Sequence, residues 1–290
     1  MIKSGFVSIA GRPNAGKSTL LNTILGEKRA IVTPKPQTTN KNIQGVYNDL
    51  RGQIVFIDTP GIHKPKTPYG EYLNKQAYQS IRGSEVTLLV VDASVEYGAG
   101  DEYLFSRLKV DHPLIIVLTK IDLASPIHVQ KVKEQWTQNY PDTPLIEVSS
   151  VRNFNIDALI TLIFEHLEVG PLYFPLPEDY AIRLENYINE IVREKIIMLT
   201  REEIPYSVAV VVDHLTESDT KVEAYLTIYC EKDSQKGILI GKGAKMIKRI
   251  RLQAQYELSK FLGKDVLLEL MVKVEPLWRS DPKILKKLLG

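Results

Sequence analysis

The octapeptide GRPNAGKS at residues 11–18 constrains the fold more than any other part of the chain. It fits the pattern GxxxxGK followed by Ser or Thr, and it lies between the apolar run FVSIAG at 6–11 and a helical pattern at 17–26. Two glycines at this spacing let the backbone wrap tightly, so that its N–H groups converge on a phosphate. A glycine turn before an ordinary helix is the alternative, but the flanking strand and helix favour a phosphate loop. The predicted contacts are Gly11, Arg12, Pro13, Asn14, Ala15, Gly16, Lys17, Ser18 and Thr19.

Strand-like runs alternate with helical patterns along the first 167 residues. The predicted strands are 6–11, 53–61, 86–94, 113–122 and 144–150, and the predicted helices lie near 17–26, 68–82, 100–109, 127–139 and 155–167. The strand runs are nearly continuous in Val, Ile and Leu, as expected for strands buried on both faces. This alternation predicts an α/β P-loop domain with a mostly parallel sheet and helices on both faces.

The length of 290 residues favours two domains. The stretch EVGPLYFPLPED at 168–179 carries three prolines and one glycine and ends the alternation. Behind it the pattern becomes helix, strand, strand, a second glycine loop with its helix, and a last strand, which indicates a smaller α+β domain. We therefore predict a first domain at 1–170, a linker at 171–179 and a second domain at 180–290.

Composition excludes several classes of protein. The formal net charge is only +2, so any nucleic-acid surface must be a local patch. Cys230 is the single cysteine and lies in an apolar run, which excludes an internal disulfide and predicts a buried structural thiol. The N-terminal apolar stretch is too short for a signal peptide, and no long uninterrupted apolar run follows. We therefore expect a cytoplasmic protein.

Two further motifs end predicted strands. DTPG at 58–61 lets Asp58 hold a Mg²⁺ shell through water, beside Ser18, while the Gly61 N–H meets a γ-phosphate. TKID at 119–122 places Asp122 where its carboxylate accepts two hydrogen bonds from guanine. Adenine offers neither donor, so this carboxylate selects GTP over ATP.

With these motifs, residues 5–167 resemble a translation-factor-type GTPase domain. The resemblance implies that Thr39 is the switch threonine on Mg²⁺, with Thr38 as a competing candidate, and that Lys120 lies beside the base. Its nucleotide contacts are Asp58, Thr59, Pro60, Gly61, Ile62, Thr119, Lys120, Asp122, Ser149, Ser150 and Val151. The family usually has asparagine where this chain has Thr119, so we expect weaker nucleotide binding with guanine selection retained.

The residue after DTPG raises the question of what activates water. Related GTPases use a glutamine there, whereas this chain has Ile62, whose side chain cannot orient water. GTPases of this kind often hold K⁺ with an asparagine of the phosphate loop, and Asn14 matches; capping of a turn is its alternative role. His63 is more simply a solvated loop residue than a base. The predicted catalytic residues are Asn14, Lys17, Thr39 and Gly61.

The stretch ILIGKGAKMIKRIR at 238–251 forms the second glycine loop. It lacks the GK ending with Ser or Thr that Mg²⁺ would need, and residues 234–256 carry six basic side chains and no acidic one. Ile247, Ile250, Ala254, Leu258 and Phe261 recur at helical spacing and predict a buried stripe. The loop and the element order resemble a type II KH domain, whose GxxG loop clamps about four single-stranded nucleotides. The predicted RNA contacts are Lys236, Ile240, Gly241, Lys242, Gly243, Ala244, Lys245, Lys248, Arg249 and Arg251.

Two details of this loop leave alternatives open. The fourth position of the motif is Ala244 instead of glycine, and alanine disfavours a positive φ. We expect bases in the neighbouring groove, against 238–240. By composition these three apolar residues read as a strand, whereas the resemblance implies a short helix.

Together the two halves resemble bacterial ribosome-assembly GTPases, which join a TrmE-Era-EngA-like GTPase domain to a type II KH domain. Residues 200–213, 266–274 and 278–279 extend the likeness. It implies a monomer that binds GTP, GDP and the 3′ end of small-subunit (16S) rRNA during 30S subunit biogenesis. The alternative is a peripheral membrane or cell-cycle signalling GTPase with a basic tail at 282–289, whose second domain binds protein or lipid.

Overall fold

A computed structural model describes residues 2–28, 30, 43–65, 67–108, 110–174, 184–201 and 204–289. The chain divides into two compact units, Met1–Lys66 with Gly70–Tyr180 and Thr67–Tyr69 with Ala181–Gly290. The predicted linker at 171–179 continues past Phe174, outside the described residues.

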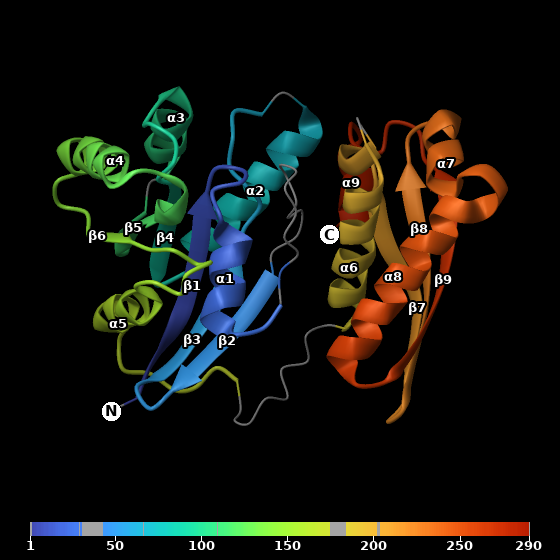
Figure 1. Ribbon diagram of the computed structural model, residues 1–290, viewed down its shortest axis with the longest axis horizontal. Helices are drawn as coiled ribbons and strands as arrows, with labels where there is room; N and C mark the ends of the chain where they lie inside the picture. Colours follow the sequence, from blue (N-terminus) through green and yellow to red (C-terminus); the bar gives the residue numbers. More distant parts are fainter. Residues whose placement is uncertain are drawn as a thin grey trace. The chain divides into compact units, whose positions relative to one another are not determined.

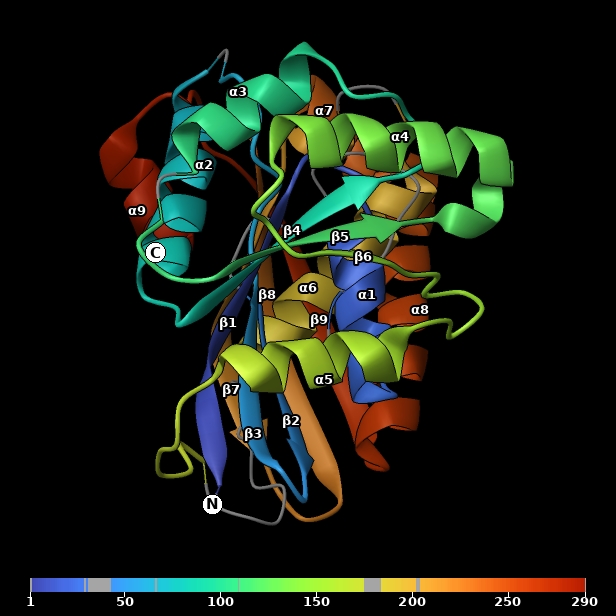
Figure 2. The same cartoon turned by 90° about the vertical axis from the view of Figure 1, so that its left-hand side faces the viewer.

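The first unit is built around a six-stranded sheet in the order β2-β3-β1-β4-β5-β6 (Figures 1 and 2). Its strands are β1 (Lys3–Gly11), β2 (Ile43–Asp49), β3 (Gly52–Asp58), β4 (Val86–Asp92), β5 (Leu114–Thr119) and β6 (Leu145–Glu147). All neighbouring pairs are parallel except β2 with β3. The predicted α/β class with a mostly parallel sheet is confirmed.

Helices cover both faces of this sheet and form two separate cores. The helices are α1 (Lys17–Leu25), α2 (Pro68–Arg82), α3 (Ala99–Arg107), α4 (Pro126–Asn139) and α5 (Ile156–His166), with a 3₁₀ turn at Ile121–Leu123. Apolar side chains of α1 and α5 pack on one face, and those of α2, α3 and α4 pack on the other. Because parallel strands end at one edge, the loops after β1, β3, β4 and β5 gather there.

The antiparallel edge strand β2 was missed by the sequence patterns. Its sequence, IQGVYND, has few apolar residues and includes Gly45, so its β signal is weak. Gly45 is needed for packing, since a β-carbon there would lie 2.4 Å from the Leu25 side chain. The turn at Leu50–Arg51 that joins β2 to β3 was the available signal for a hairpin.

The second unit has the helix and strand order predicted for a type II KH domain. Its elements are α6 (Leu184–Leu199), a 3₁₀ turn at Ile204–Tyr206, β7 (Ala209–Glu217), β8 (Lys221–Cys230), α7 (Asp233–Ile240), a 3₁₀ turn at Lys242–Ala244, α8 (Lys245–Leu262), β9 (Asp265–Val274) and α9 (Pro282–Leu289). β8 is central, antiparallel to β7 and parallel to β9. Within the predicted stripe of α8, Ile250, Ala254 and Leu258 are buried, while Ile247 and Phe261 are half-buried.

The structure decides between the two readings of 238–240. These residues end helix α7, so the strand inferred from their composition is wrong and the helix implied by the resemblance is confirmed. The reason is amphipathic spacing: Gln235 and Leu239, four residues apart, are buried, whereas Ile238 is 47% exposed.

Cys230 and the C-terminal tail both contribute to the packing of the second unit. Cys230 is buried as predicted, and burial raises the pKa of its thiol. Helix α9 packs against β7, with Leu285 and Leu288 buried and Lys283 exposed. Two leucines of this basic tail are therefore already covered in the structure. Among the described helices, none combines the length and apolar character that a membrane crossing requires.

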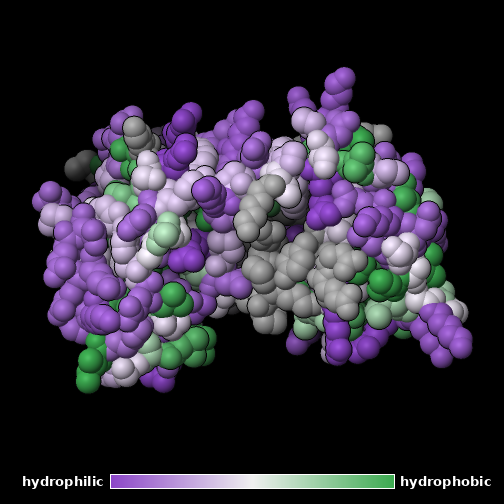
Figure 3. All heavy atoms as spheres, turned by 90° about the horizontal axis from the view of Figure 1, so that it is seen from above, coloured by the Kyte–Doolittle hydropathy of each residue, from purple (hydrophilic) through white to green (hydrophobic). Residues whose placement is uncertain are grey.

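The surface shown in Figure 3 is mainly hydrophilic. Hydrophobic residues occur on this face in small groups, which is normal for a folded domain. Charged and polar groups are therefore what a partner would chiefly meet on this face.

Each unit has one buried tryptophan. In the first unit, Trp136 of α4 is fully buried and packs edge to face with Tyr97, their ring centroids 5.1 Å apart. In the second, Trp278 is fully buried and its Nε1 donates a hydrogen bond to the Ser207 carbonyl at 3.2 Å. These aromatic side chains fill the space beside α4 in one unit and beside the start of β7 in the other.

We expect Trp136→Ala to lower the free energy of unfolding of the first unit by about 3–5 kcal/mol, because it leaves a large cavity under α4. Urea unfolding followed by circular dichroism measures the change. Trp136→Phe should cost clearly less, and Leu50→Ala, at a fully exposed position, should cost almost nothing. An equal loss for the alanine and phenylalanine variants would contradict this view of the α4 core.

Candidate functional site

The phosphate loop joins the end of β1 to the start of α1, as its sequence predicted. Gly16 precedes α1 with a φ of 96°, and a β-carbon there would lie 3.4 Å from Thr119 Oγ1. At Gly11, a β-carbon would lie 2.4 Å from the Val90 carbonyl oxygen of β4. A side chain at Gly11 therefore has no room, and one at Gly16 would also be strained.

Lys17, Ser18 and Asp58 come together beside this loop. Lys17 is buried, and its Nζ donates hydrogen bonds to the carbonyls of Gly11 at 3.3 Å and Arg12 at 2.9 Å. Burial lowers the pKa of Lys17 to about 8, while the charge of Asp58 acts in the opposite direction. Ser18 Oγ donates to Asp58 Oδ2 at 2.6 Å. A hydroxyl and a carboxylate at this separation are oxygen ligands that suit Mg²⁺. Thr38 and Thr39 lie outside the described residues.

The DTPG segment lies directly against the phosphate loop. The Thr59 hydroxyl donates to the Ile9 carbonyl at 2.9 Å, and the Ile62 N–H donates to the Gly11 carbonyl at 3.0 Å. A β-carbon at Gly61 would lie 2.7 Å from Pro13, which explains the glycine. Ile62 is fully buried in the core formed by α2, α3 and α4, so its side chain points away from the phosphate site.

His63 is held by its own loop. Its Nδ1 lies 3.1 Å from the Gly61 carbonyl oxygen, and Asn74 Nδ2 donates to the His63 carbonyl at 2.7 Å. Asn74 comes from α2 and is buried. His63 is half-buried, and these contacts give it a structural role in the loop, so the predicted solvated residue is wrong in that respect.

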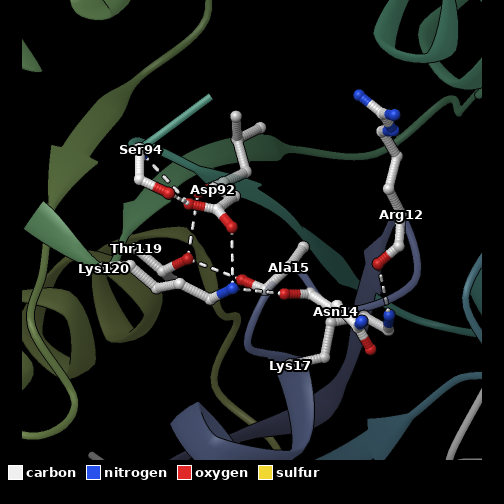
Figure 4. Close-up of polar contacts among 9 residues, drawn as sticks. Arg12, Asn14, Ala15, Lys17, Asp92, Ser94, Thr119 and Lys120 are labelled. Atoms are coloured by element: carbon white, nitrogen blue, oxygen red, sulfur yellow. Dashed lines mark hydrogen bonds and ion pairs between the residues drawn. The ribbon is translucent and has the colours of Figure 1, made fainter. Parts of the chain in front are cut away.

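Residues 119 and 120 fasten two consecutive carbonyls of the phosphate loop (Figure 4). Thr119 Oγ1 lies 2.6 Å from the Ala15 carbonyl oxygen and 3.0 Å from that of Val91. Lys120 Nζ donates to the Asn14 carbonyl at 2.6 Å and to Asp92 Oδ2 at 2.7 Å. The hydroxyl of Thr119 therefore braces the loop without an asparagine amide.

Asp92 was missed by the sequence patterns. Its Oδ1 accepts hydrogen bonds from the Ser94 N–H at 3.0 Å and the Ser94 hydroxyl at 2.6 Å, which leaves Oδ2 directed at Lys120. Figure 4 shows this chain of contacts from Ser94 to the phosphate loop. A carboxylate at the last position of β4, on the edge where the loops gather, was the signal that could have indicated it.

Asp122 lies beside Ser149, and both are among the predicted nucleotide contacts. Ser149 is buried, and its hydroxyl donates to Asp122 Oδ1 at 2.6 Å. The Ser150 carbonyl accepts from Thr23 Oγ1 at 3.3 Å, which ties this segment to α1. The side chain of Val151 is 81% exposed. The structure thus brings Asp122 and Ser149 together, while the Val151 side chain lies in solvent.

Arg12 points away from the phosphate site. Its Nη1 forms an ion pair with Asp101 Oδ2 of α3 at 3.0 Å, and Figure 4 shows the side chain directed away from Lys17. Asp101 Oδ2 also accepts from the Gly98 N–H at 3.1 Å. The Arg12 side chain is therefore engaged elsewhere, and only the backbone of Arg12 remains for the predicted phosphate contact.

The second glycine loop has a positive φ at three of its four positions. Gly241, Gly243 and Ala244 have φ values of 72°, 60° and 59°. Ala244 thus adopts the conformation that its β-carbon disfavours, directly before α8 begins at Lys245. At Gly243 a β-carbon would meet nothing within 4 Å, so this part of the loop is open to a ligand.

A groove of about 370 Å³ lies between α8 and β9. It is lined by Gly243, Ala244, Ile247, Lys248, Arg251, Glu269 and Leu270. Sequence reasoning missed the two β9 residues, because only the fold brings them to the loop. The bases were predicted against 238–240, but Leu239 is fully buried and this lining includes no α7 residue. Lys236 and Ile240 are half-buried in α7, and Lys242, Lys245 and Arg249 are exposed.

Comparisons with known proteins agree with this geometry. A family described as 50S ribosome-binding GTPase matches residues 6–120, and a KH domain family matches residues 203–279. GTPase Era of Heliobacterium modesticaldum (strain ATCC 51547 / Ice1) is 43% identical over 287 residues, covering 98% of this chain and 96% of that protein.

Two solved structures are similar over almost the whole chain. A variant of Aquifex aeolicus Era bound to GDP·AlF4⁻ has a TM-score of 0.93 at 35% identity, covering 99% of each chain. Era in complex with MgGDPNP and nucleotides 1506–1542 of 16S ribosomal RNA has a TM-score of 0.94, again at 35% identity and 99% of each chain. Since this similarity spans both units and both glycine loops, the chain belongs to the Era family of GTPases.

Proposed function

We propose that this GTPase binds and hydrolyses GTP in its first unit and binds 16S rRNA near the 3′ end through its second, in support of rRNA processing and 30S subunit biogenesis. The observation that carries the proposal is the presence in one chain of two separate anion-binding loops. One is braced beside Lys17, Ser18 and Asp58, and the other opens on a basic groove. The similar Era structure that holds MgGDPNP and an rRNA fragment supports both halves.

The proposed domain boundaries follow the predicted ones, with the GTPase domain at 1–170, a linker at 171–179 and the KH domain at 180–290. In the GTPase domain, Lys17 and the Gly61 N–H would contact the terminal phosphates. Ser18, Asp58 and Thr39 would hold Mg²⁺, which when bound supplies positive charge against the phosphate oxygens. The fit rests on the adjacent oxygens of Ser18 and Asp58.

Guanine selection is assigned to Asp122. The Ser149 hydroxyl donates to one of its carboxylate oxygens, a contact that would orient the carboxylate for the base. Lys120 would lie along the base while its ammonium holds the phosphate loop. The loop after β5 would then position both the residue that recognises the base and the loop that binds phosphate.

Asn14 would hold a K⁺ ion, which when bound would supply positive charge near the β- and γ-phosphate oxygens. Ile62 is buried and cannot orient water, so another group must offset the charge that develops on the phosphates. The Asn14 side chain is exposed at the phosphate loop, where a cation would act much as an arginine finger does. A φ of 63° also favours asparagine for the turn itself, so a test must separate the two roles.

We expect GTP hydrolysis to be at least about tenfold faster in K⁺ than in Na⁺, because Asn14 would hold K⁺ where its charge offsets the charge that develops on the phosphates. Phosphate release at equal ionic strength measures this. Asn14→Gly accepts the same positive φ but lacks the amide, so it should lose the K⁺ stimulation. Equal rates in the two salts, or an unchanged Asn14→Gly variant, would leave Asn14 with only its turn role.

We expect Asp92→Ala to speed release of GDP about tenfold, because Lys120 loses the charged partner that holds it against the Asn14 carbonyl. Stopped-flow release of a fluorescent GDP analogue measures the rate. Asp92→Asn keeps a hydrogen-bond acceptor and should lie between the alanine variant and the parent. The matched control is Glu96→Ala, a few residues after Asp92, which removes only an exposed ion pair with Lys131. A similar rate change in this control would rule out a specific effect of Asp92.

RNA binding is tested at the second loop. Gly241→Asp with Gly243→Asp should abolish binding to the RNA 1506–1542 while GTP hydrolysis stays within about twofold, because a carboxylate replaces the open approach to phosphate. Gly243→Asp alone avoids crowding of Met246 and should weaken binding strongly, whereas Gly237→Asp in α7 should not. Unchanged RNA affinity in the loop variants would favour a second unit that binds protein or lipid.

A further inference from the structure

Helix α8 presents three distinct sides. Ile250, Ala254 and Leu258 form the buried side, and Lys248 and Arg251 line the groove against β9. Successive residues of an α-helix are turned by 100°, so Lys245, Arg249, Leu252, Tyr256 and Lys260 fall within one narrow sector opposite the buried side. We call these five residues the outer face of α8. The groove and the outer face are therefore different surfaces of the same helix. Lys245 and Arg249, which the sequence grouped with the contacts of the glycine loop, do not line the groove and belong to the outer face.

All five outer-face residues are exposed, and their chemistry is unusual for a solvated helix. Leu252 is 49% exposed and Tyr256 is 74% exposed, in the middle of the face. Lys245, Arg249 and Lys260 flank them, all of one sign. A bulky aromatic ring between cations is the pattern that binds single-stranded nucleic acid, where rings stack on bases and cations meet phosphates.

On a solvated helix, carboxylates at i, i+3 or i, i+4 spacing from the cations stabilise the helix. In α8 the single acidic residue is Glu257, which lies beside the outer face and pairs with Lys195 of α6. In the described part of the chain, Lys245, Arg249 and Lys260 form no ion pair. Their charges are therefore available to a polyanion.

We infer that the outer face of α8 is a second RNA-binding surface, which holds the part of the RNA that continues beyond the strand in the groove. Lys245 begins the face next to the glycine loop, and Lys260 lies about 22 Å further along the helix axis at 1.5 Å per residue. An RNA strand leaving the loop can follow this face, with its phosphates near the cations and a base on Tyr256. This inference rests on the proposed RNA binding of the second unit.

The test uses the full chain and two kinds of RNA, the fragment 1506–1542 of 16S rRNA and tetranucleotides cut from it that can fill only the groove. The outer-face variant is Arg249→Gln, Tyr256→Ala and Lys260→Gln. We expect it to bind the long RNA at least about tenfold more weakly and with a salt slope smaller by about 1.4, from two lost phosphate contacts. Its affinity for tetranucleotides should stay within about twofold of the parent.

A matched groove variant, Lys248→Gln with Arg251→Gln, removes the same number of charges from the same helix. It should weaken both RNAs. Long-RNA affinity equal to the parent in the outer-face variant overturns the inference, as does an equal loss for long and short RNA. Loss of binding to phosphatidylglycerol vesicles with unchanged RNA binding would assign the face to membranes and also overturn it. If the parent protein binds neither RNA, the proposed function itself fails.

Discussion

The nucleotide site depends above all on hydrogen bonds that hold two neighbouring carbonyl groups of the phosphate loop in place. The carbonyl oxygens of Asn14 and Ala15 are held from β5 by Lys120 and Thr119. A peptide whose carbonyl is fixed outward has its N–H directed the other way, toward the space where phosphate binds. Asp92 and the Val91 carbonyl hold the same two side chains from β4. The same hydrogen bonds therefore connect the phosphate loop, the residues assigned to base recognition and the ends of β4 and β5.

The sequence predicted most of this site because its motifs are local. A phosphate loop, a DTPG turn and a TKID strand end each need only the right residues at fixed spacing, and parallel strands bring their ends to one edge. Asp92 and the edge strand β2 were not predicted. Asp92 acts on a residue of a neighbouring strand, and β2 has a weak local signal that depends on its pairing with β3.

The second unit shows a different balance between local and tertiary signals. Residues 238–240 look like a strand by composition, but burial of Leu239 against the sheet and exposure of Ile238 favour a helix. Ala244 adopts a positive φ because the start of α8 and the glycine before it determine the chain path there. Likewise, Glu269 and Leu270 reach the groove only through the parallel pairing of β9 with β8. Each of these features depends on contacts between residues that are not adjacent in the sequence.

The distribution of indole rings has a practical consequence for spectroscopy. The chain has two tryptophans, Trp136 in the first unit and Trp278 in the second, each shielded from water. Tryptophan emission from a protein with only one of them, excited where tyrosine does not absorb, therefore comes from a single unit, without any attached dye. Quenching and lifetime of Trp278 alone can thus report how the environment of the KH unit responds when guanine nucleotides are exchanged in the other.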